Sequence, residues 1–457
     1  MPKIENDLSR GPVFVKLMLF ALPFLASNVV QSLYNVADML IVGNFAGTVS
    51  MSGVNIGGQV TFILTNVVIG LCMGATVLIG QYMGLKDRGA LNRVTATIIT
   101  LLLMLSAFIT VFMLIFKAPL LRLIQTPAEA FAESDSYLTV TVIGVVFIFG
   151  YNALSGILRG MGNSREPFYF VLVACMVNIA LDLVFVAVFH WDAFGAALAT
   201  VISQALSMFL CIIYMVRNRF SFNFKPSSFR IYGDQLANIL RIGLPTCAQN
   251  AVTSFSFLFL TAIVNLFGVS ASAAVGAVGK FNSFAFMPTM ALSASIGAMA
   301  AQNIGAGRMD RAVEACRIGT GFSVILTWLF FVLVQVFPVP ILSIFSRDPE
   351  MIAAGVTYLR SFSFDFLIIP FIFCISGFLI GGGHTVFTLI VSMLSAVVLR
   401  VPVCWIFGVV LNMGPFGVGL GAPVASAGTL LLIVVYMISG RWKVNAALGK
   451  GPAEPPS

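Results

Sequence analysis

Twelve apolar runs, each long enough to cross a lipid bilayer as a helix, dominate this chain of 457 residues. A membrane-spanning helix needs about 20 mostly apolar residues. The expected spans lie at roughly 13–45, 53–82, 92–116, 137–160, 166–189, 194–216, 236–268, 275–303, 312–337, 353–380, 385–410 and 417–440. Short clusters of Gly, Asn, Lys, Asp and Arg separate them. The chain is therefore predicted to be an all-α polytopic membrane protein.

The composition excludes several other classes of protein. Hydrophobic residues make up 59% of the chain and charged residues 9%, where soluble proteins carry roughly 45–50% and 25%. The net charge of +8 is spread over short loops, whereas a nucleic-acid partner requires a clustered basic face. The seven Cys are scattered without a CxxC pair, so we predict no zinc site and no disulfide framework. We expect the bilayer as a partner, and no nucleic acid and no cofactor.

The Lys and Arg residues predict the orientation of the spans. With twelve spans, the two termini and the loops that follow even-numbered spans lie on one side of the membrane. That side holds nineteen of the Lys and Arg residues, and the other side holds six when charges inside the spans are counted with it. Positively charged loops stay in the cytoplasm. Both termini are therefore expected to be cytoplasmic.

The two halves of the chain repeat each other. At a shift of 221 residues the segment SGILRGMG at 155–162 matches SGFLIGGG at 376–383, and at a shift of 222 residues Pro23 matches Pro245. Six spans return the chain to its starting side, so the repeats are expected to be parallel. Parallel six-span lobes around a central cavity are typical of alternating-access transporters. Duplication for stability alone is the alternative interpretation.

The repeat predicts where the domains begin and end. The expected parts are a cytoplasmic N-terminus (1–12), an N-lobe (13–216), a cytoplasmic linker (217–235), a C-lobe (236–440) and a cytoplasmic tail (441–457).

Two acids in the N-lobe are the main candidates for a functional site. A charge inside a membrane helix costs about 2.5–3.5 kcal/mol and marks a functional site by default. Asp38 and Asp182 each lie roughly 10 Å inside the external boundary at helical rise. Tyr34 and Asn178 stand four residues before them, on the same helix faces. Thr200 reaches a similar depth. If these helices are neighbours, the polar groups converge at one level.

This set of residue types favours the binding of a small cation. Buried carboxylates favour either a proton or a bound cation, and a second carboxylate nearby strengthens that preference. Such a pair can load and release H⁺. With the oxygens of Asn178 and Thr200 added, coordination of Na⁺ by Asp38, Asn178, Asp182 and Thr200 is equally compatible with the sequence. A satisfied structural hydrogen-bond network is the alternative.

Three other residues inside the spans are predicted to form an ion pair and a hinge. Asp365 and Arg400 lie on consecutive antiparallel spans at matched depth, so we predict a structural ion pair inside the C-lobe, with a second coupling site as the alternative. Pro23 removes a backbone hydrogen bond from the first span and predicts a possible hinge there.

At these residues the chain resembles a known family. The residues that carry the resemblance are Pro23 followed by YNVADMLIVG, Gln81-Tyr82-Met83-Gly84, the turn LRGMGNSR and the segment NIALDLVF. In this order, over about residues 10–443, they are similar to the multidrug and toxic compound extrusion (MATE) transporters, and most similar to the DinF-like branch.

The resemblance implies a function and assigns residues to it. It implies a monomeric H⁺- or Na⁺-coupled antiporter of a prokaryotic cytoplasmic membrane, which exports amphipathic, often cationic drugs. Asp38, Asn178, Asp182 and Thr200 match the proposed ion site of the branch, Tyr34 and Asn152 match cavity-lining positions, and Pro23 matches the bend of the first helix.

The chain departs from the NorM-like branch, which places acids in the seventh and tenth spans. Here those positions hold Ser254 and Ile369, so we do not expect the C-lobe cation site of that branch. A flippase of a lipid-linked precursor is the related alternative, although few Lys or Arg lie inside the spans. An intramembrane enzyme would need a His/Asp or Ser/Lys pair within the spans, and the sequence has none. A passive channel is a further alternative function.

Overall fold

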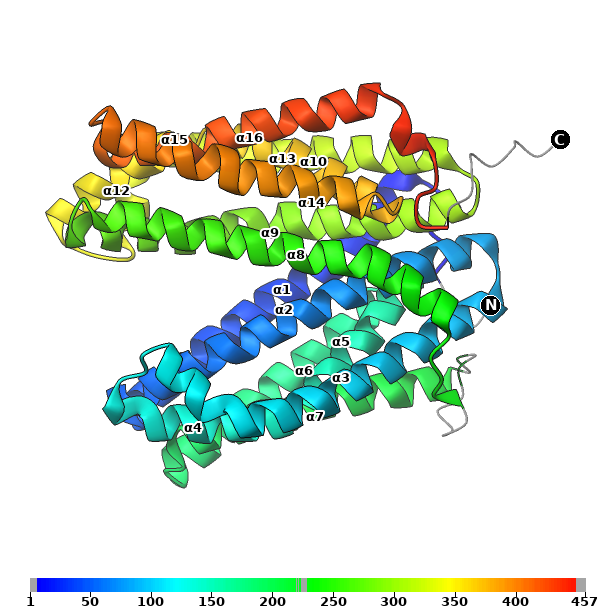
Figure 1. Ribbon diagram of the computed structural model, residues 1–457, viewed down its shortest axis with the longest axis horizontal. Helices are drawn as coiled ribbons and strands as arrows, with labels where there is room; N and C mark the ends of the chain where they lie inside the picture. Colours follow the sequence, from blue (N-terminus) through cyan, green and yellow to red (C-terminus); the bar gives the residue numbers. More distant parts are fainter. Residues whose placement is uncertain (1–5, 219, 221, 223–227, 449–457) are drawn as a thin grey trace. The chain divides into compact units, whose positions relative to one another are not determined.

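The computed structural model describes residues 6–218, 220, 222 and 228–448, and long helices make up most of this part of the chain (Figure 1). Ten of the described helices are long and apolar enough to cross a membrane, and two bent helix pairs raise the number of spans to as many as twelve. The prediction of an all-α membrane fold is confirmed.

The helices of the first repeat follow the expected spans closely. In chain order they are α1 (Val13–Phe45), α2 (Gly47–Leu85), α3 (Arg88–Leu123), α4 (Ala128–Ile143), α5 (Val145–Gly160), α6 (Arg165–Asp182), the π-helical segment η1 (Leu183–Val188) and α7 (Asp192–Arg217).

The second repeat has the same order of long helices with more interruptions. Its elements are α8 (Gly233–Asn265), α9 (Val269–Gly305), α10 (Met309–Val336), α11 (Pro338–Ser343), α12 (Pro349–Phe362), α13 (Asp365–Gly381), α14 (Thr385–Met393), the π-helical η3 (Leu394–Arg400), α15 (Val401–Trp405), the π-helical η4 (Ile406–Val410), α16 (Gly414–Ile438) and the 3₁₀ turn η5 (Arg441–Lys443).

The polar clusters between spans act as helix ends. Lys86 adopts a left-handed conformation that ends α2, and the next residue, Asp87, begins α3 by accepting a hydrogen bond from the amide of Ala90 at 2.9 Å. A side chain that accepts from a first-turn amide satisfies a donor that the helix itself leaves free. The sequence GLKDRG therefore turns the chain between two spans.

The fourth and tenth expected spans are each broken into two helices. α4 and α5 meet at Gly144 with a bend of 50°, and α12 and α13 meet with a bend of 50° as well. Because the two breaks occupy corresponding places in the two repeats, the bend belongs to the duplicated fold and not to one half of it.

The backbone repeats several turns at corresponding places in the two halves. Five pairs of residues with a left-handed backbone recur at a shift of 221 or 222, and three of the pairs differ in residue type: Gly47 with Gly268, Lys86 with Gly307, Gly162 with Gly383, His190 with Asn412, and Asp192 with Gly414. A left-handed conformation is costly for residues other than glycine. Its recurrence at His190 and Asn412, with φ of 54° and 53°, shows that the turn geometry is shared even where the residue is not.

The described chain forms two compact units, and each takes a helix segment from the other repeat. The first unit comprises Met1–Asp7 and Leu22–Gly243, and the second comprises Leu8–Ala21 and Leu244–Ser457. The start of α1 thus belongs to the second unit, where the buried Leu8, Leu17 and Phe20 join a core with α9, α10 and α13. The sequence predicts that the chain divides at the linker 217–235, with one whole repeat in each lobe. That prediction does not include the exchange of helix starts between the two units.

The start of α8 makes the reciprocal exchange. It packs in the first unit, where a Cβ added at Gly74 of α2 would lie 2.5 Å from the carbonyl oxygen of Ile239. Both exchanged segments end just before a proline inside a helix, because the unit boundaries fall between Ala21 and Leu22 and between Gly243 and Leu244, ahead of Pro23 in α1 and Pro245 in α8.

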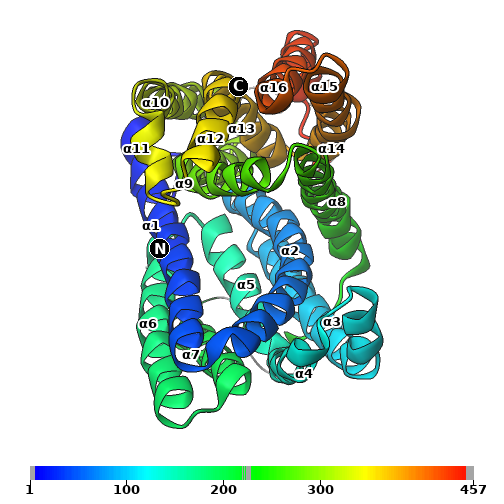
Figure 2. The same ribbon diagram turned by 90° about the vertical axis from the view of Figure 1, so that its left-hand side faces the viewer.

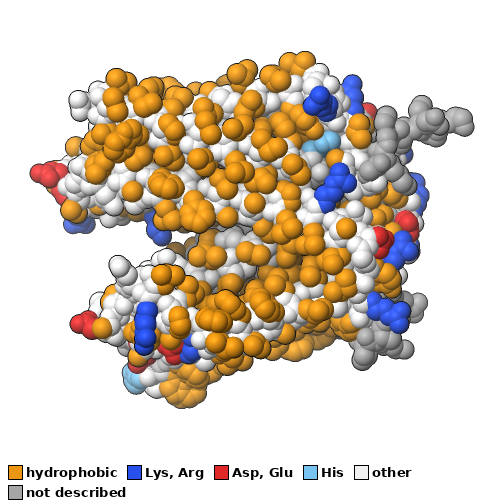
Figure 3. Space-filling model, in the orientation of Figure 1, with side chains coloured by type: hydrophobic (Ala, Val, Ile, Leu, Met, Phe, Trp, Pro, Cys, Tyr) orange, Lys and Arg blue, Asp and Glu red, His pale blue; other side chains and the backbone are white. Residues whose placement is uncertain are grey.

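The surface of each unit is that of a membrane protein. Large apolar side chains are exposed along the flanks of the helices, and on the face shown in Figure 3 the charged side chains lie mostly toward the helix ends. Helices of this length and apolarity can cross the hydrocarbon core of a bilayer. The chain is therefore a multi-pass membrane protein.

Candidate functional site

The structure brings Asp38 and Asp182 together in the first unit. Asp38 lies on α1, and Asp182 is the last residue of α6, directly before the π-helical η1. Their carboxyl groups are within side-chain hydrogen-bonding reach of each other, and the exposed fractions are 8% for Asp38 and 0% for Asp182. Figure 2 looks along the helices and shows α1, α6 and α7 beside one another in this unit. A hydrogen bond between two carboxyl groups requires a proton on one of them.

The two acids have few other partners. Among the described residues, no amide, hydroxyl or other fixed donor reaches either oxygen of Asp182 or Oδ1 of Asp38. The amide of Asn178, which is fully buried one helical turn before Asp182, also has no partner at Oδ1 or Nδ2. Buried polar atoms of a structural network are almost always hydrogen-bonded. This arrangement disfavours the alternative of a satisfied structural network.

Two tyrosines and a threonine complete the polar cluster. The hydroxyl of Tyr34 on α1 and Oγ1 of Thr200 on α7 form a hydrogen bond of 2.9 Å. The hydroxyl of Tyr137 on α4 is also within hydrogen-bonding reach of Thr200, and both tyrosines lie close enough to Asp38 and Asp182 to interact with their charges. Four helices therefore contribute to one site.

The site can hold a proton or a small hard cation. A proton can bridge the carboxyl groups of Asp38 and Asp182. A Na⁺ ion would find carboxylate oxygens with the amide oxygen of Asn178 and the hydroxyl of Thr200 nearby, and hard cations prefer oxygen ligands. The described residues contain no group of three or more His, Cys, Asp or Glu that could hold a metal ion of another kind.

Tyr137 is the member of the site that the sequence did not single out. The only signal for it was its place in the repeat, where Tyr137-Leu138 matches Tyr358-Leu359 at a shift of 221. That match marks a position without assigning a role, because an aromatic side chain in a span is usually a packing residue. The position of α4 beside α7 brings its hydroxyl to Thr200.

The other predicted residues of the first unit lie outside this cluster. Asn152 on α5 donates a hydrogen bond of 2.8 Å to the carbonyl of Ile148 in its own helix, and its place in a cavity stays a prediction. Pro23 lies inside α1, where its carbonyl accepts a hydrogen bond of 2.9 Å from the hydroxyl of Ser27. Motion at Pro23 also stays a prediction.

Asp365 and Arg400 occupy one region of the second unit. Asp365 is buried, with 1% exposed, and interacts electrostatically with Arg400. Asp365 Oδ1 and Arg400 Nε have no hydrogen-bond partner among the residues that the structure describes, and the guanidinium lies over the ring of Phe257 at 5.3 Å. Within the described part of the chain no hydrogen bond or ion pair joins Asp365 to Arg400, and the predicted structural ion pair stays a prediction.

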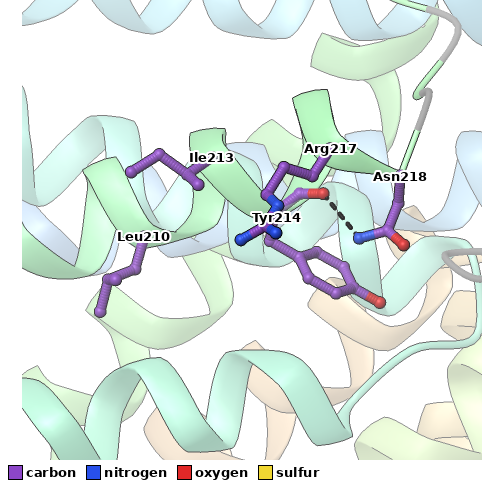
Figure 4. A pocket seen from close by; sticks show the side chains of 5 residues that line it. All are labelled: Leu210, Ile213, Tyr214, Arg217 and Asn218. Carbon is purple, nitrogen blue, oxygen red and sulfur yellow. Dashed lines mark hydrogen bonds between the residues drawn. The ribbon is translucent and has the colours of Figure 1, made fainter.

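A surface pocket on α7 is separate from the acid pair. It has a volume of about 410 Å³ and is lined by Leu210, Ile213, Tyr214, Arg217 and Asn218 (Figure 4). The side chain of Asn218 donates to the carbonyl of Tyr214 at 2.9 Å and borders the pocket. Thr200 is some four helical turns away along α7, at 3.6 residues per turn. The pocket therefore does not reach the acids.

Comparisons with known proteins agree on one family. The MatE family model matches residues 23–184 and 245–406, which is one match in each repeat. The "Probable multidrug resistance protein YoeA" of Bacillus subtilis (strain 168) is 29% identical over 442 residues, which cover 95% of this chain and 96% of the relative. The "Probable multidrug resistance protein YpnP" of the same organism is 27% identical over 440 residues and covers 96% of this chain and 97% of the relative.

A search of solved structures found the same fold. The "Crystal structure of MATE in the bent conformation" superposes with a TM-score of 0.88 at 21% identity, and the match covers 97% of each chain.

Proposed function

The chain belongs to the MatE family of membrane transporters, and on that premise we propose that it is a cation-coupled antiporter that exports amphipathic, often cationic compounds. It is a transporter and not an enzyme. The names of its relatives support multidrug export as its task. A small organic molecule is the proposed cargo, and H⁺ or Na⁺ is the proposed coupling ion.

One observation carries the proposal: the carboxyl groups of Asp38 and Asp182 lie within hydrogen-bonding reach of each other, buried in the first unit, and no fixed donor among the described residues reaches three of their four oxygens. Two carboxylates in contact in a medium of low dielectric repel each other strongly. Taking up one H⁺ or Na⁺ removes that repulsion. The pair therefore has a physical reason to bind an ion, and to change its packing when the ion leaves.

The proposed cycle uses this change to move cargo. An ion from outside neutralises the pair, and the polar contacts that join α1, α4, α6 and α7 rearrange around it. The rearrangement lowers the affinity for cargo in the outward-facing state and favours its release. Each elementary charge that moves inward contributes about 2.3 kcal/mol per 100 mV of membrane potential. One or two ions per cycle would sustain a large cargo gradient.

The proposed setting is the cytoplasmic membrane of a prokaryote, with both termini in the cytoplasm and the protein acting as a monomer. The distribution of Lys and Arg supports this orientation, since nineteen of them fall on the side of the termini.

The test is efflux by the purified protein in vesicles under imposed ΔpH and ΔNa⁺ gradients, applied separately. The variant Asp38→Asn removes a charge and keeps the shape of the side chain, so it should abolish ion-driven dye efflux. The matched control is Asp310→Asn, the same substitution at an exposed position in the first turn of α10. Efflux that continues at the wild-type rate in Asp38→Asn would refute the role of the pair.

A flippase of a lipid-linked precursor is the alternative in the same superfamily. Reconstituted protein offered a lipid-linked sugar should leave it in its original leaflet if the proposal is right. Translocation of that lipid without efflux of the dyes would favour the alternative.

A further inference from the structure

The second unit has an apolar pocket on its flank. The pocket has a volume of about 550 Å³ and is formed by α10, α13, the end of α16 and η5, with α13 packed against both α10 and α16 (Figure 2). Most of the lining side chains are apolar, among them Val324, Ile375 and Phe378. The lining residues of α10 extend from Val313 to Val324, which is about 16 Å at helical rise. The pocket is therefore a groove that follows the helices.

One end of this groove is basic. Arg317 lines it from α10 and is exposed. Trp442 lines it from η5, and the residues on either side of Trp442 are Arg441 and Lys443, both exposed. The ammonium group of Lys443 lies over the indole ring of Trp442, 5.8 Å from its centre. Glu314, an exposed acid one turn before Arg317, leaves this end of the groove with a net positive charge.

Trp442 is held in place at the basic end. Its indole N–H donates a hydrogen bond of 2.7 Å to the carbonyl of Met437 in α16. Its ring meets the ring of Phe378 edge to face, with 5.5 Å between the two centres. Tryptophan is enriched where the hydrocarbon core of a bilayer meets the headgroups. The groove therefore leads from hydrocarbon depth beside Val324 to the level of the headgroups at Trp442.

The basic end of the groove is expected to face the cytoplasm. It lies where α10 begins and where α13 and α16 end, and the distribution of Lys and Arg assigns this end of the spans to the cytoplasmic side. Basic pockets between membrane helices on that side bind anionic lipid headgroups. The charge of the groove is thus complementary to the phosphate of an anionic lipid, and its apolar length is complementary to an acyl chain.

We propose that this groove binds one anionic phospholipid of the cytoplasmic leaflet, with an acyl chain between α10 and α13 and the phosphate at Arg317 and Lys443. A guanidinium group binds phosphate through two parallel hydrogen bonds. A zwitterionic phospholipid offers the same chain and phosphate, but its own ammonium group is repelled by the basic end of the groove. The groove therefore prefers an anionic headgroup. The inference goes beyond the proposed function and does not depend on ion coupling.

Gly321 offers a way to close the groove without disturbing the helices. It lines the groove from α10, and a Cβ added there meets nothing within 4 Å. Gly321→Leu therefore places a side chain in the space assigned to the acyl chain. The matched control is Gly279→Leu on α9, since Gly279 is exposed and a Cβ there also meets nothing within 4 Å.

The experiment is native mass spectrometry of the full chain, freed of lipid in detergent and titrated with phosphatidylglycerol or with phosphatidylethanolamine of the same acyl chains. We expect one phosphatidylglycerol to bind saturably and more tightly than phosphatidylethanolamine. Arg317→Gln should weaken binding of phosphatidylglycerol about fivefold and remove the preference. Arg347→Gln, at an exposed arginine between α11 and α12, should change neither affinity. Gly321→Leu should weaken binding of both lipids, and Gly279→Leu should weaken neither.

A second measurement does not depend on the folding of Gly321→Leu. In vesicles, phosphatidylglycerol brominated near the top of its acyl chains should quench tryptophan fluorescence, and Trp442→Phe should remove the part of the quenching that Arg317→Gln also reduces.

Three results would overturn the inference: equal affinity for phosphatidylglycerol in Arg317→Gln and Arg347→Gln, no preference of the wild type for phosphatidylglycerol over phosphatidylethanolamine, or unchanged lipid binding in a folded Gly321→Leu variant. None of these measurements involves efflux. Failure of the Asp38→Asn efflux test would instead count against the proposed function.

Discussion

The hydroxyl of Tyr34 is hydrogen-bonded to Oγ1 of Thr200 at 2.9 Å and so joins α1 to α7 beside the acid pair. Tyr34 stands one turn of α1 before Asp38, and therefore the bond fixes the face of α1 that carries the acid. Thr200 also lies within reach of Tyr137 on α4. A change at Asp38 can in this way be transmitted to two further helices.

Replacing Tyr34 with Phe should weaken ion coupling without unfolding the protein. The substitution removes one hydrogen bond, worth roughly 1 kcal/mol or about a fivefold change in affinity. We expect the concentration of H⁺ or Na⁺ that half-activates efflux to rise by about that factor, with the maximal rate retained. The matched control is Tyr214→Phe on α7, whose hydroxyl pairs with Asn163 at 3.3 Å. Equal shifts in both variants would contradict the assignment.

Replacing Asn178 with Ala should distinguish the two candidate ions. A proton bridging Asp38 and Asp182 does not need the amide, whereas a bound Na⁺ loses an oxygen ligand. We expect Na⁺-driven efflux to need roughly tenfold more Na⁺, which corresponds to about 1.4 kcal/mol, while H⁺-driven efflux is unchanged. Asn44→Ala is the control, because Asn44 is exposed and donates a hydrogen bond to the carbonyl of Leu40 in its own helix. Loss of both activities would show that Asn178 supports the fold of the site.

Replacing Gly74 with Ala should destabilise the first unit. An added Cβ would lie 2.5 Å from the carbonyl oxygen of Ile239 and 3.0 Å from the amide of Gly243, both backbone atoms of the exchanged start of α8. Overpacking of this kind costs typically about 1–3 kcal/mol. Purified Gly74→Ala should unfold at a lower temperature in detergent. Gly276→Ala is the control, since a Cβ there meets nothing within 4 Å, and it should unfold no earlier than the wild type.

The C-terminal segment after α16 should loosen in acid through His384. This side chain lies between α13 and α14, where its ring bonds Tyr436 at 2.9 Å and the carbonyl of Val444 at 2.9 Å. Burial lowers the pKa of His384, so the unfolded chain takes up a proton more readily than the folded one. The stability contributed by neutral His384 is complete above its ordinary pKa of about 6.5 and declines as the pH falls below it.

Hydrogen exchange measures this effect directly. The amides of residues 441–448 should exchange faster at mildly acidic than at mildly alkaline pH, after correction for the intrinsic rate. His384→Gln should remove most of that difference, and His190→Gln, at an exposed histidine, should leave it in place. A pH difference that persists in His384→Gln would assign it to another group.

Features that depend on distance along the chain follow directly from the order of the residues. Span length and the depth of each acid follow from a helical rise of 1.5 Å per residue, which is why the sequence places Asp38 and Asp182 at one level. The repeat follows from residues that match at a fixed shift. The bends and turns also follow the repeat, since they recur where the sequences align.

Which side chains meet depends on how the helices pack, and this does not follow from distance along the chain. Depth does not fix the rotation of a helix about its axis or the identity of its neighbours, because packing against other helices sets both. For this reason the approach of Asp38 to Asp182 and the inclusion of Tyr137 depend on helix packing, as does the lack of a hydrogen bond between Asp365 and Arg400 in the described part of the chain. The exchange of the starts of α1 and α8 between the units is also not predicted by the repeat, because the repeat assigns all helices of one half to one lobe.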